Sequence, residues 1–326
     1  MEVRDYMTDG KMRVHHVDEA GIAQDTDAIH PFGKHADWNE SFYFNLYDKE
    51  KDICAFMRIG LKPNKNEKSM LCYIMMPDGS VLSVRDVEPC KVTELKVNGL
   101  QFRRIVPEKE WKMEFTGTMK RTLGDSIERR NVEFSLSYEA ANKIFDYRDC
   151  AAGGKEVVSQ VEAAEHTEQF GKIRGDLTIA GETINVKGFG EKDHAWGLTD
   201  WMAPTMWIWF SCQFSERFAF NLMKLIVGTE VVDAGYIHID GDNRPIVRAD
   251  LITEYVKGGG PKNIKMWLTE KDGTVHEVQA DVLRSTKLPF GGILEKSVAV
   301  MHEALARFQL GNEVGYGVVE YLIRET

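Results

Sequence analysis

The residues of this chain best suited to chemistry lie in one stretch, GFGEKDHAWGLTDW at residues 188–201. Asp193 and His194 are the residue types that most often transfer protons near neutral pH. Trp196 and Trp201 are large rigid side chains, and the glycines allow close backbone approach. The stretch predicts acid–base chemistry in a partly apolar surround. The alternative is a structural role, in which Asp193 accepts backbone hydrogen bonds and the tryptophans fill a core.

His166 and Glu168 lie upstream and point to a second kind of chemistry. They are two residues apart on an expected strand, so both side chains point to one face. With Asp193 and His194 they offer nitrogen and oxygen ligands suitable for Zn²⁺ or Fe²⁺. Adjacent residues such as Asp193 and His194 nevertheless point in opposite directions in an extended segment. We therefore expect no metal, and keep a metal-dependent oxygenase or hydrolase as an alternative function.

Nucleotide cofactors have no motif in this chain. No GxxxxGK[ST], HExxH or GxSxG sequence occurs, and the residues after Gly188 and Gly190 lack the spacing of a dinucleotide fingerprint. We expect no cofactor. Proton transfer needs none, because burial and neighbouring charges can tune the pKa of a side chain. The 14 Met, 16 Phe, 10 Tyr and 7 Trp residues fit either a barrel with an apolar pocket or two ordinary cores.

Composition indicates a soluble globular protein. The 326 residues are 43% hydrophobic and 28% charged, with a net charge of −10. This acidic balance argues against nucleic acid or an anionic membrane as a partner. No apolar run approaches the length of a membrane-spanning helix, so we expect no membrane insertion. The five scattered cysteines contain no CxxC, which indicates reduced thiols and a cytoplasmic protein.

Short strands are expected to position the candidate residues. Segments rich in β-branched and aromatic residues alternate with turns such as Pro77–Ser80 along the whole chain, a pattern typical of an antiparallel sandwich or barrel. The segment at 156–168 is helical by composition, and we predict a helical turn followed by a strand over 164–170. The segment at 293–308 is ambiguous because its alanines and charges favour a helix. We predict a strand over 304–310.

Gly153 and Gly154 separate two strand-rich halves. We therefore predict an all-β protein with two domains, residues 1–160 and residues 161–326. Open sheet edges in two such domains favour a homodimer.

The chain resembles a lipocalin-like double-barrel superfamily. The central pattern is Glu168-Gln169, then GxxxIxGE from Gly175, then GFGxxDHxWG from Gly188. The segments WNESFYF at 38–44 and GYGVVEY at 315–321 resemble the superfamily's opening and closing strands. The superfamily includes the carotenoid 1,2-hydratases (hydroxyneurosporene synthases), AttH-like proteins and fungal lipocalin-like Diels–Alderases. The chain is similar to an uncharacterised bacterial branch of it.

This resemblance implies two calycin-like antiparallel β-barrels, an apolar ligand pocket and no obligatory cofactor. It implies catalytic roles for Asp193, His194, Glu40 and Glu168, with Asp193 or Glu40 as the general acid and His194 as its partner or as the base. The side chains expected to line the pocket are Trp38, Tyr43, Trp196 and Trp201. Ala195 stands where the superfamily commonly has serine.

The expected function is that of a cofactor-independent lyase, hydratase or isomerase. As a lyase it would be a hydro-lyase or would release an aldehyde. Its substrate would be a hydrophobic small molecule such as a terpenoid, steroid, polyketide or lignin-type aromatic. A non-catalytic lipophile-binding protein is a further alternative, because barrels of this size often hold one ligand.

Overall fold

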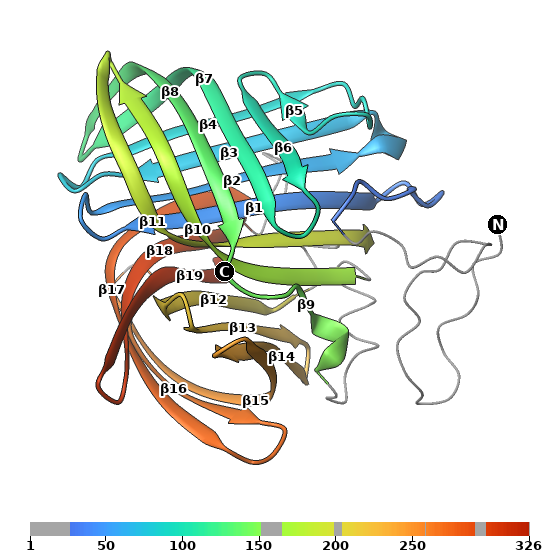
Figure 1. Ribbon diagram of the computed structural model, residues 1–326, viewed down its shortest axis with the longest axis vertical. Helices are drawn as coiled ribbons and strands as arrows, with labels where there is room; N and C mark the ends of the chain where they lie inside the picture. The colour runs from blue at the N-terminus through green and yellow to red at the C-terminus, as the bar shows by residue number, and fades with distance from the viewer. Residues whose placement is uncertain (1–26, 151–164, 199–203, 258, 291–297, 326) are drawn as a thin grey trace.

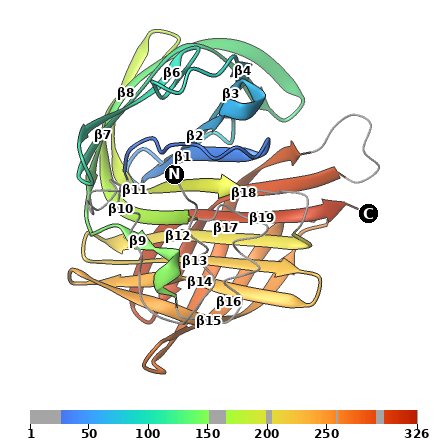
Figure 2. The ribbon, with the colours of Figure 1, turned by 90° about the vertical axis from the view of Figure 1, so that its right-hand side faces the viewer.

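The computed structural model describes residues 27–150, 165–198, 204–257, 259–290 and 298–325. Antiparallel strands make up most of this part of the chain, with short 3-10 turns at Pro63–Lys65 (η1) and Tyr147–Asp149 (η2). Within these residues there is no helix with the length and apolarity of a bilayer span. Two strand layers lie one above the other in both views, the N-terminal one in blue to yellow-green and the C-terminal one in gold to red (Figures 1 and 2).

The N-terminal sheet has the strand order β4-β3-β2-β1-β11-β10-β8-β7-β6-β5, with β9 paired to β10. β4, at one end of this order, also pairs with β7, so the eight strands from β4 to β7 in this order close into a first barrel, and β6 and β5 extend from β7. Its strands are β1 (Trp38–Asp48), β2 (Ile53–Lys62), β3 (Glu67–Met75), β4 (Val81–Glu88), β5 (Lys96–Val97), β6 (Leu100–Val106), β7 (Glu110–Leu123), β8 (Ser126–Ala140), β9 (Phe145–Asp146), β10 (Glu165–Ile179) and β11 (Glu182–Leu198).

The C-terminal strands form a closed barrel in sequence order, with β12 paired to β19. They are β12 (Met206–Ser215), β13 (Phe218–Val227), β14 (Glu230–Ile239), β15 (Asp242–Tyr255), β16 (Pro261–Glu270), β17 (Val275–Phe290), β18 (Val298–Leu310) and β19 (Glu313–Glu325). The expected all-β fold with two antiparallel barrels is confirmed, and the ambiguous segment before Leu310 is a strand.

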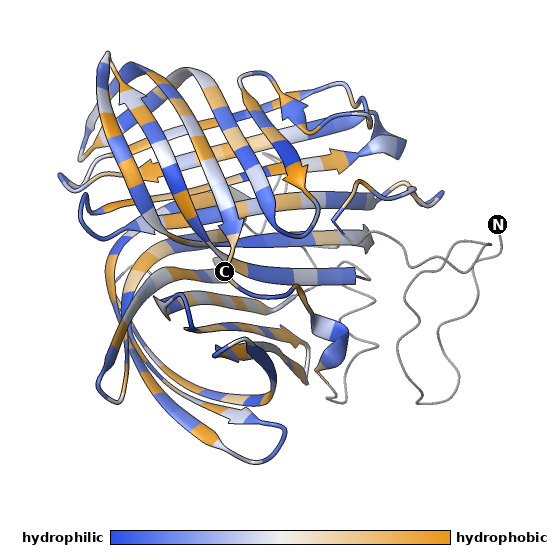
Figure 3. Ribbon diagram, in the orientation of Figure 1, coloured by the Kyte–Doolittle hydropathy of each residue, from blue (hydrophilic) through white to orange (hydrophobic). Residues whose placement is uncertain are grey.

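Hydrophobic and hydrophilic residues alternate along many strands (Figure 3), because successive side chains of a strand point to opposite faces. In β1 and β2 both faces are buried, since one face lines the first barrel and the other packs on the second barrel. Three apolar clusters result. One fills the first barrel around Phe44, one fills the second around Phe210, and one lies between the barrels around Trp209.

The change from one barrel to the other does not coincide with the expected domain division at residue 160. β10 and β11 follow that position in sequence, yet they pair with β8 and β1 of the first barrel. The change of sheet lies between Leu198 and Met206. The helical turn expected within 156–168 lies mostly outside the described residues, and the strand expected over 164–170 is the start of β10.

The glycines of the central motif allow β11 to approach β1. A Cβ on Gly190 would lie 1.8 Å from the carbonyl oxygen of Asn45, and one on Gly188 would lie 2.2 Å from that of Tyr47. Both distances are far below van der Waals contact, and the obstructing atoms belong to the backbone. The GFG sequence therefore keeps two strands of the first barrel in register.

Gly190→Ala is expected to lower the free energy of unfolding by about 2 kcal/mol or more, because backbone must move to admit the methyl group. Chemical denaturation monitored by tryptophan fluorescence would measure this loss. Gly124→Ala is the control: this glycine has a φ of 55° and open space around its Cβ position, so only about 1 kcal/mol of backbone strain is expected. Equal losses in the two variants would contradict the close-approach explanation.

Candidate active site

Strand β11 divides the central motif between two environments. Asp193 faces the second barrel, whereas His194 lies on the opposite face, where its ring stacks on Phe42 of the first-barrel core at 3.9 Å. The expected pairing of Asp193 with His194 is therefore wrong. Their side chains diverge because neighbouring residues of an extended strand point to opposite sides. Each residue instead has partners on neighbouring strands.

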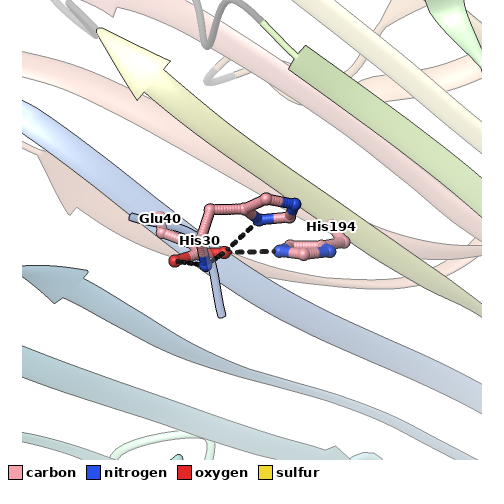
Figure 4. Close-up of side chains that lie close together, drawn as sticks. All are labelled: His30, Glu40 and His194. Carbon is pink, nitrogen blue, oxygen red and sulfur yellow. Dashed lines mark hydrogen bonds and ion pairs between the residues drawn. The ribbon is translucent and has the colours of Figure 1, made fainter. Parts of the chain in front are cut away.

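His194 belongs to a buried cluster with Glu40 and His30 (Figure 4). His194 Nε2 lies 2.9 Å and His30 Nδ1 lies 2.8 Å from the same oxygen, Glu40 Oε1. The His30 backbone N–H also donates to both carboxylate oxygens at 3.1 Å. Trp196 stacks on the His30 ring at 3.9 Å. We name these four residues the clasp, since they hold the segment before β1 against β1 and β11.

The clasp carboxylate is ionised near neutral pH. Burial opposes ionisation of Glu40, but hydrogen bonds from His194 and His30 outweigh it and lower the pKa. An ionised carboxylate only accepts hydrogen bonds, so both ring nitrogens must carry protons toward it. Burial lowers the pKa of His194, which favours its neutral form. The Glu40 carboxylate is thus well satisfied by protein donors.

Asp193 belongs to a second cluster, which lies between the barrels. His166 Nε2 lies 3.0 Å from Asp193 Oδ2 and 3.1 Å from Glu168 Oε1. The second barrel also contacts Glu168, because Trp209 Nε1 donates a hydrogen bond to Glu168 Oε1 at 2.9 Å. The Glu168 side chain is fully buried, while that of Asp193 is 18% exposed. Asp193 is therefore the member of the cluster that a small molecule can reach.

Strand register extends this cluster into a row across four strands. Arg58, Tyr43, Asp193 and Glu168 are successive partners on β2, β1, β11 and β10. We name them the N-terminal row. Paired residues of adjacent strands point to the same face, and the Tyr43 ring meets that of Trp209 across the interface at 5.8 Å.

The second barrel offers a matching row to the interface. Trp209, Glu320 and Glu303 are successive partners on β12, β19 and β18, and we name them the C-terminal row. Glu320 and Glu303 are almost fully buried and share a hydrogen bond. Because Glu320 also interacts electrostatically with Asp193 and Glu168, the two rows form one site.

Burial dominates the acidity of this site. It raises the pKa of Glu168 to about 7, with the charge of Asp193 adding to the effect. It raises the pKa of Glu320 to about 8 and that of Glu303 well above its usual value. Near neutral pH these carboxyl groups hold protons that they can release. The geometry therefore combines a reachable carboxylate with buried proton donors.

The remaining predicted site residues divide between the two environments. Tyr43 and Glu168 join Asp193 between the barrels. Trp196 lies in the clasp, and Trp38 contacts Phe32 on the segment before β1. Trp201 lies outside the described residues.

An apolar ligand pocket was expected, either inside one barrel or between the two. Among the described residues, the interior of the first barrel holds an apolar cavity of about 10 Å³. Such a cavity has room for about one water molecule and not for a substrate. Apolar side chains pack the interiors of both barrels in this part of the chain, and the partly exposed Asp193 lies between the barrels.

Sequence reasoning missed Glu303, Glu320 and Arg58. The two glutamates are 17 positions apart (320 minus 303) and meet only because β18 and β19 form a hairpin. The sequence does contain a signal for Glu320, which is the one charged residue in the apolar segment VVEYLI at 318–323. A charged side chain is costly to bury, so its presence in such a segment indicates a specific role.

In the part of the chain that the structure describes, two sets of three residues have the donor types of a metal site. The ligand atoms of His30, Glu40 and His194 lie within 4.8 Å of one another, as do those of His166, Glu168 and Asp193. In the first set the Glu40 carboxylate already accepts four hydrogen bonds, so a metal would have to displace imidazole protons. The second set has the reachable Asp193 and is the better candidate.

Glu40→Gln is expected to lower the free energy of unfolding by about 2 kcal/mol near pH 7, because hydrogen bonds to a charged acceptor are lost. The folded pKa of Glu40 is depressed, so its contribution is present above the unfolded pKa and is lost as pH falls through the folded value. The deficit should therefore shrink in acid. Urea unfolding near pH 7 and in acid would measure it. Exposed Glu182→Gln is the control, and an equal loss there would contradict a role for the clasp.

Glu320→Gln is expected to stabilise the protein at alkaline pH relative to the wild type. The folded pKa of Glu320 is raised, so its stability contribution is present below the unfolded pKa and is lost as pH rises through about 8. A neutral amide removes this loss. Melting temperatures should therefore diverge in favour of the variant as pH rises from about 5 to about 9. Exposed Glu313→Gln on the same strand should follow the wild type; a pH-independent difference for Glu320→Gln would refute the assignment.

Comparison with solved structures gives distant relatives of the whole fold. A putative AttH (NE1406) from Nitrosomonas europaea superimposes with a TM-score of 0.63 at 14% identity, covering 89% of this chain and 94% of that one. Kievitone hydratase from Nectria haematococca gives 0.60 at 12% identity, with 92% and 95% covered. CghA gives 0.59 at 10% identity, with 88% of each chain covered.

These matches confirm the resemblance to the lipocalin-like double-barrel superfamily at the level of the fold. A sequence search of curated proteins gave no significant match. One family model matches residues 23–325, nearly the whole chain. The chain therefore belongs to the family described as "Domain of unknown function (DUF7064)".

Proposed function

We propose that this protein is a cofactor-independent lyase, hydratase or isomerase that acts on a hydrophobic small molecule between its two barrels. The observation that carries the proposal is the Asp193–His166–Glu168 cluster, in which a reachable carboxylate is joined through one imidazole to a buried carboxyl group. Kievitone hydratase, one of the proteins of similar fold, is named for the addition of water to a small molecule. That likeness supports the reaction class without supplying the substrate.

The chemistry follows from the order of the three groups. Asp193 takes a proton from the substrate or delivers one to it. His166 Nε2 lies between the two carboxyl groups and moves the proton onward to Glu168. Glu168 can hold or release that proton near neutral pH, since burial raises its pKa to about 7. Elimination, hydration and isomerisation all need such paired proton transfers.

Glu40 and His194 receive a different role in this proposal. They lie on the opposite face of the sheet from Asp193 and are saturated by contacts within the clasp. We assign them to positioning β11, and through it Asp193, and not to contact with the substrate. Tyr43 remains a pocket residue, because it stands beside Asp193 in the N-terminal row.

The substrate can be sought by incubating the purified protein with hydrophobic metabolites and measuring product masses. A thermal-shift screen would select the compounds, since a ligand at 100 times its Kd adds about 2.7 kcal/mol of stability. A gain or loss of water, or release of a small aldehyde, would support the proposal. A ligand returned unchanged would favour the lipophile-binding alternative. Near-stoichiometric metal in elemental analysis would favour the metal-dependent alternative at His166, Glu168 and Asp193.

Asp193→Asn is expected to keep the fold and to lower kcat/KM by about 10² to 10⁴, the usual contribution of a positioned proton-transfer group. The amide is close in size to the carboxylate but cannot exchange the proton. Asp176→Asn is the matched control, because Asp176 is exposed on β10 of the same sheet. An Asp193→Asn protein that unfolds would show the residue to be architectural, and one with full activity would exclude it from catalysis.

A further inference from the structure

Arg58 is a charged member of the N-terminal row that has no part in the proposed proton transfer. Its side chain is partly exposed and points into the interface, where it interacts electrostatically with Asp193 and with Glu320 of the second barrel. Among the described residues it has no ion pair and no hydrogen bond. A guanidinium group carries five N–H donors and rarely lacks acceptors when it lies inside a protein.

Gly60 provides a seat for this guanidinium. A Cβ on Gly60 would lie 2.5 Å from an Nη atom of Arg58 and 3.1 Å from its Cζ. The guanidinium thus occupies the space that any other side chain at position 60 would fill. The arrangement fixes the direction of the donor groups before a ligand arrives, which reduces the entropy lost on binding.

The row beside the N-terminal row is built from small residues. Gly60, Ser41 and Ala195 are successive partners on β2, β1 and β11, and His166 follows on β10. Three small side chains in a line leave room next to Arg58 at one end and His166 at the other. Ala195 lies between Ser41 and His166 in this row and adds only a methyl group.

Tyr43 adds a second donor without a partner. Its hydroxyl is buried and has no hydrogen bond among the described residues. Burial raises the pKa of Tyr43 well above its usual value, so the hydroxyl keeps its proton. Tyr43 is also the direct strand partner of Arg58. A cation and a neutral O–H donor therefore stand side by side next to Asp193.

The acidic side chains near Arg58 leave its guanidinium available to a ligand near neutral pH. Glu320 and Glu303 hold protons there, because burial raises the pKa of Glu320 to about 8 and that of Glu303 well above its usual value. Asp193 is already paired with His166. Asp193 interacts with Arg58 electrostatically but forms no ion pair with it among the described residues, so the N–H donors of the guanidinium remain available to a ligand.

We propose that Arg58, seated on Gly60, and Tyr43 bind a negatively charged oxygen of the substrate, a carboxylate or a phenolate, and orient its apolar body toward Asp193. This inference rests on the proposed function and specifies its substrate class. Arginine suits the role because its planar fork matches a carboxylate with two parallel hydrogen bonds. The apolar remainder of the substrate would lie among Trp207, Met301 and Leu322 of the cluster between the barrels.

Binding measurements with simple probes test this without any turnover. The probes are 4-phenylbutyrate and its neutral analogue 4-phenylbutyramide, measured by calorimetry with wild-type protein. The acid is expected to bind at least about 10-fold more tightly than the amide, since charge-assisted hydrogen bonds to arginine are worth more than neutral ones. Equal binding of the acid and the amide, or binding of neither, together with no binding of the phenolate form of 4-nitrophenol, would overturn the proposal.

Variants separate the guanidinium from general effects. Arg58→Met should weaken binding of the acid by about 10- to 100-fold and leave binding of the amide unchanged. The affinity of Arg58→Lys for the acid should lie between those of the wild type and Arg58→Met, because lysine keeps the positive charge but lacks the planar set of donors of arginine. Gly60→Ala should weaken acid binding by displacing the guanidinium, and melting temperatures would establish that each variant is folded. Arg217→Met, at an exposed position of the second barrel, is the control. Unchanged acid binding by folded Arg58→Met would refute the site.

A second probe distinguishes the two kinds of oxygen. 4-Nitrophenol changes from the neutral phenol to the phenolate near neutral pH, and its absorbance reports which form is bound. Binding of the phenolate together with weak binding of phenylbutyrate would identify a phenolate site, and the reverse would identify a carboxylate site. A protein that binds these anions but transforms no substrate would retain the anion site and lose the proposed catalysis.

Discussion

The structure depends on the alternation of side chains along β11. One face of this strand packs against the core of the first barrel, and its other face packs against the second barrel. His194 and Trp196 therefore pack inward while Asp193 points outward. A shift of β11 by one residue would exchange the two sets and bury Asp193 in an apolar core, which is prohibitively costly for a carboxylate.

Several features hold that register. The close contacts of Gly188 and Gly190 with β1 fix where the two strands meet. The clasp ties β1 to β11 through Glu40 and joins both to the segment before β1. Its low-pKa carboxylate is stable when buried because it accepts hydrogen bonds from both imidazoles and from the His30 backbone N–H. The role proposed for this buried polar cluster is architectural, and it lies on the opposite face of β11 from Asp193.

The interface between the barrels is polar for a different reason. Glu168, Glu303 and Glu320 are buried there with raised pKa values, an arrangement that costs stability at alkaline pH. Packed apolar residues would stabilise such an interface at least as well. Groups of this kind cluster where protons are exchanged, which connects the unusual electrostatics of the interface with the proposed acid–base function. The proposed anion site at Arg58, which has no ion pair among the described residues, would restrict that function to substrates with an anionic oxygen.

The sequence by itself determined the all-β class, most strand positions and the superfamily resemblance carried by the motif at 188–197. These are local properties, since alternation, turn residues and motif spacing act over short ranges of chain. It also indicated that Asp193 and His194 diverge, as adjacent residues on a strand must. Only the tertiary structure decided their partners. His30, His166, Glu303 and Glu320 reach their places through pairings between distant strands and through the contact of one barrel with the other. Strand register and barrel closure depend on the packing of the whole chain, so no short segment could specify which charged residues would share one buried site.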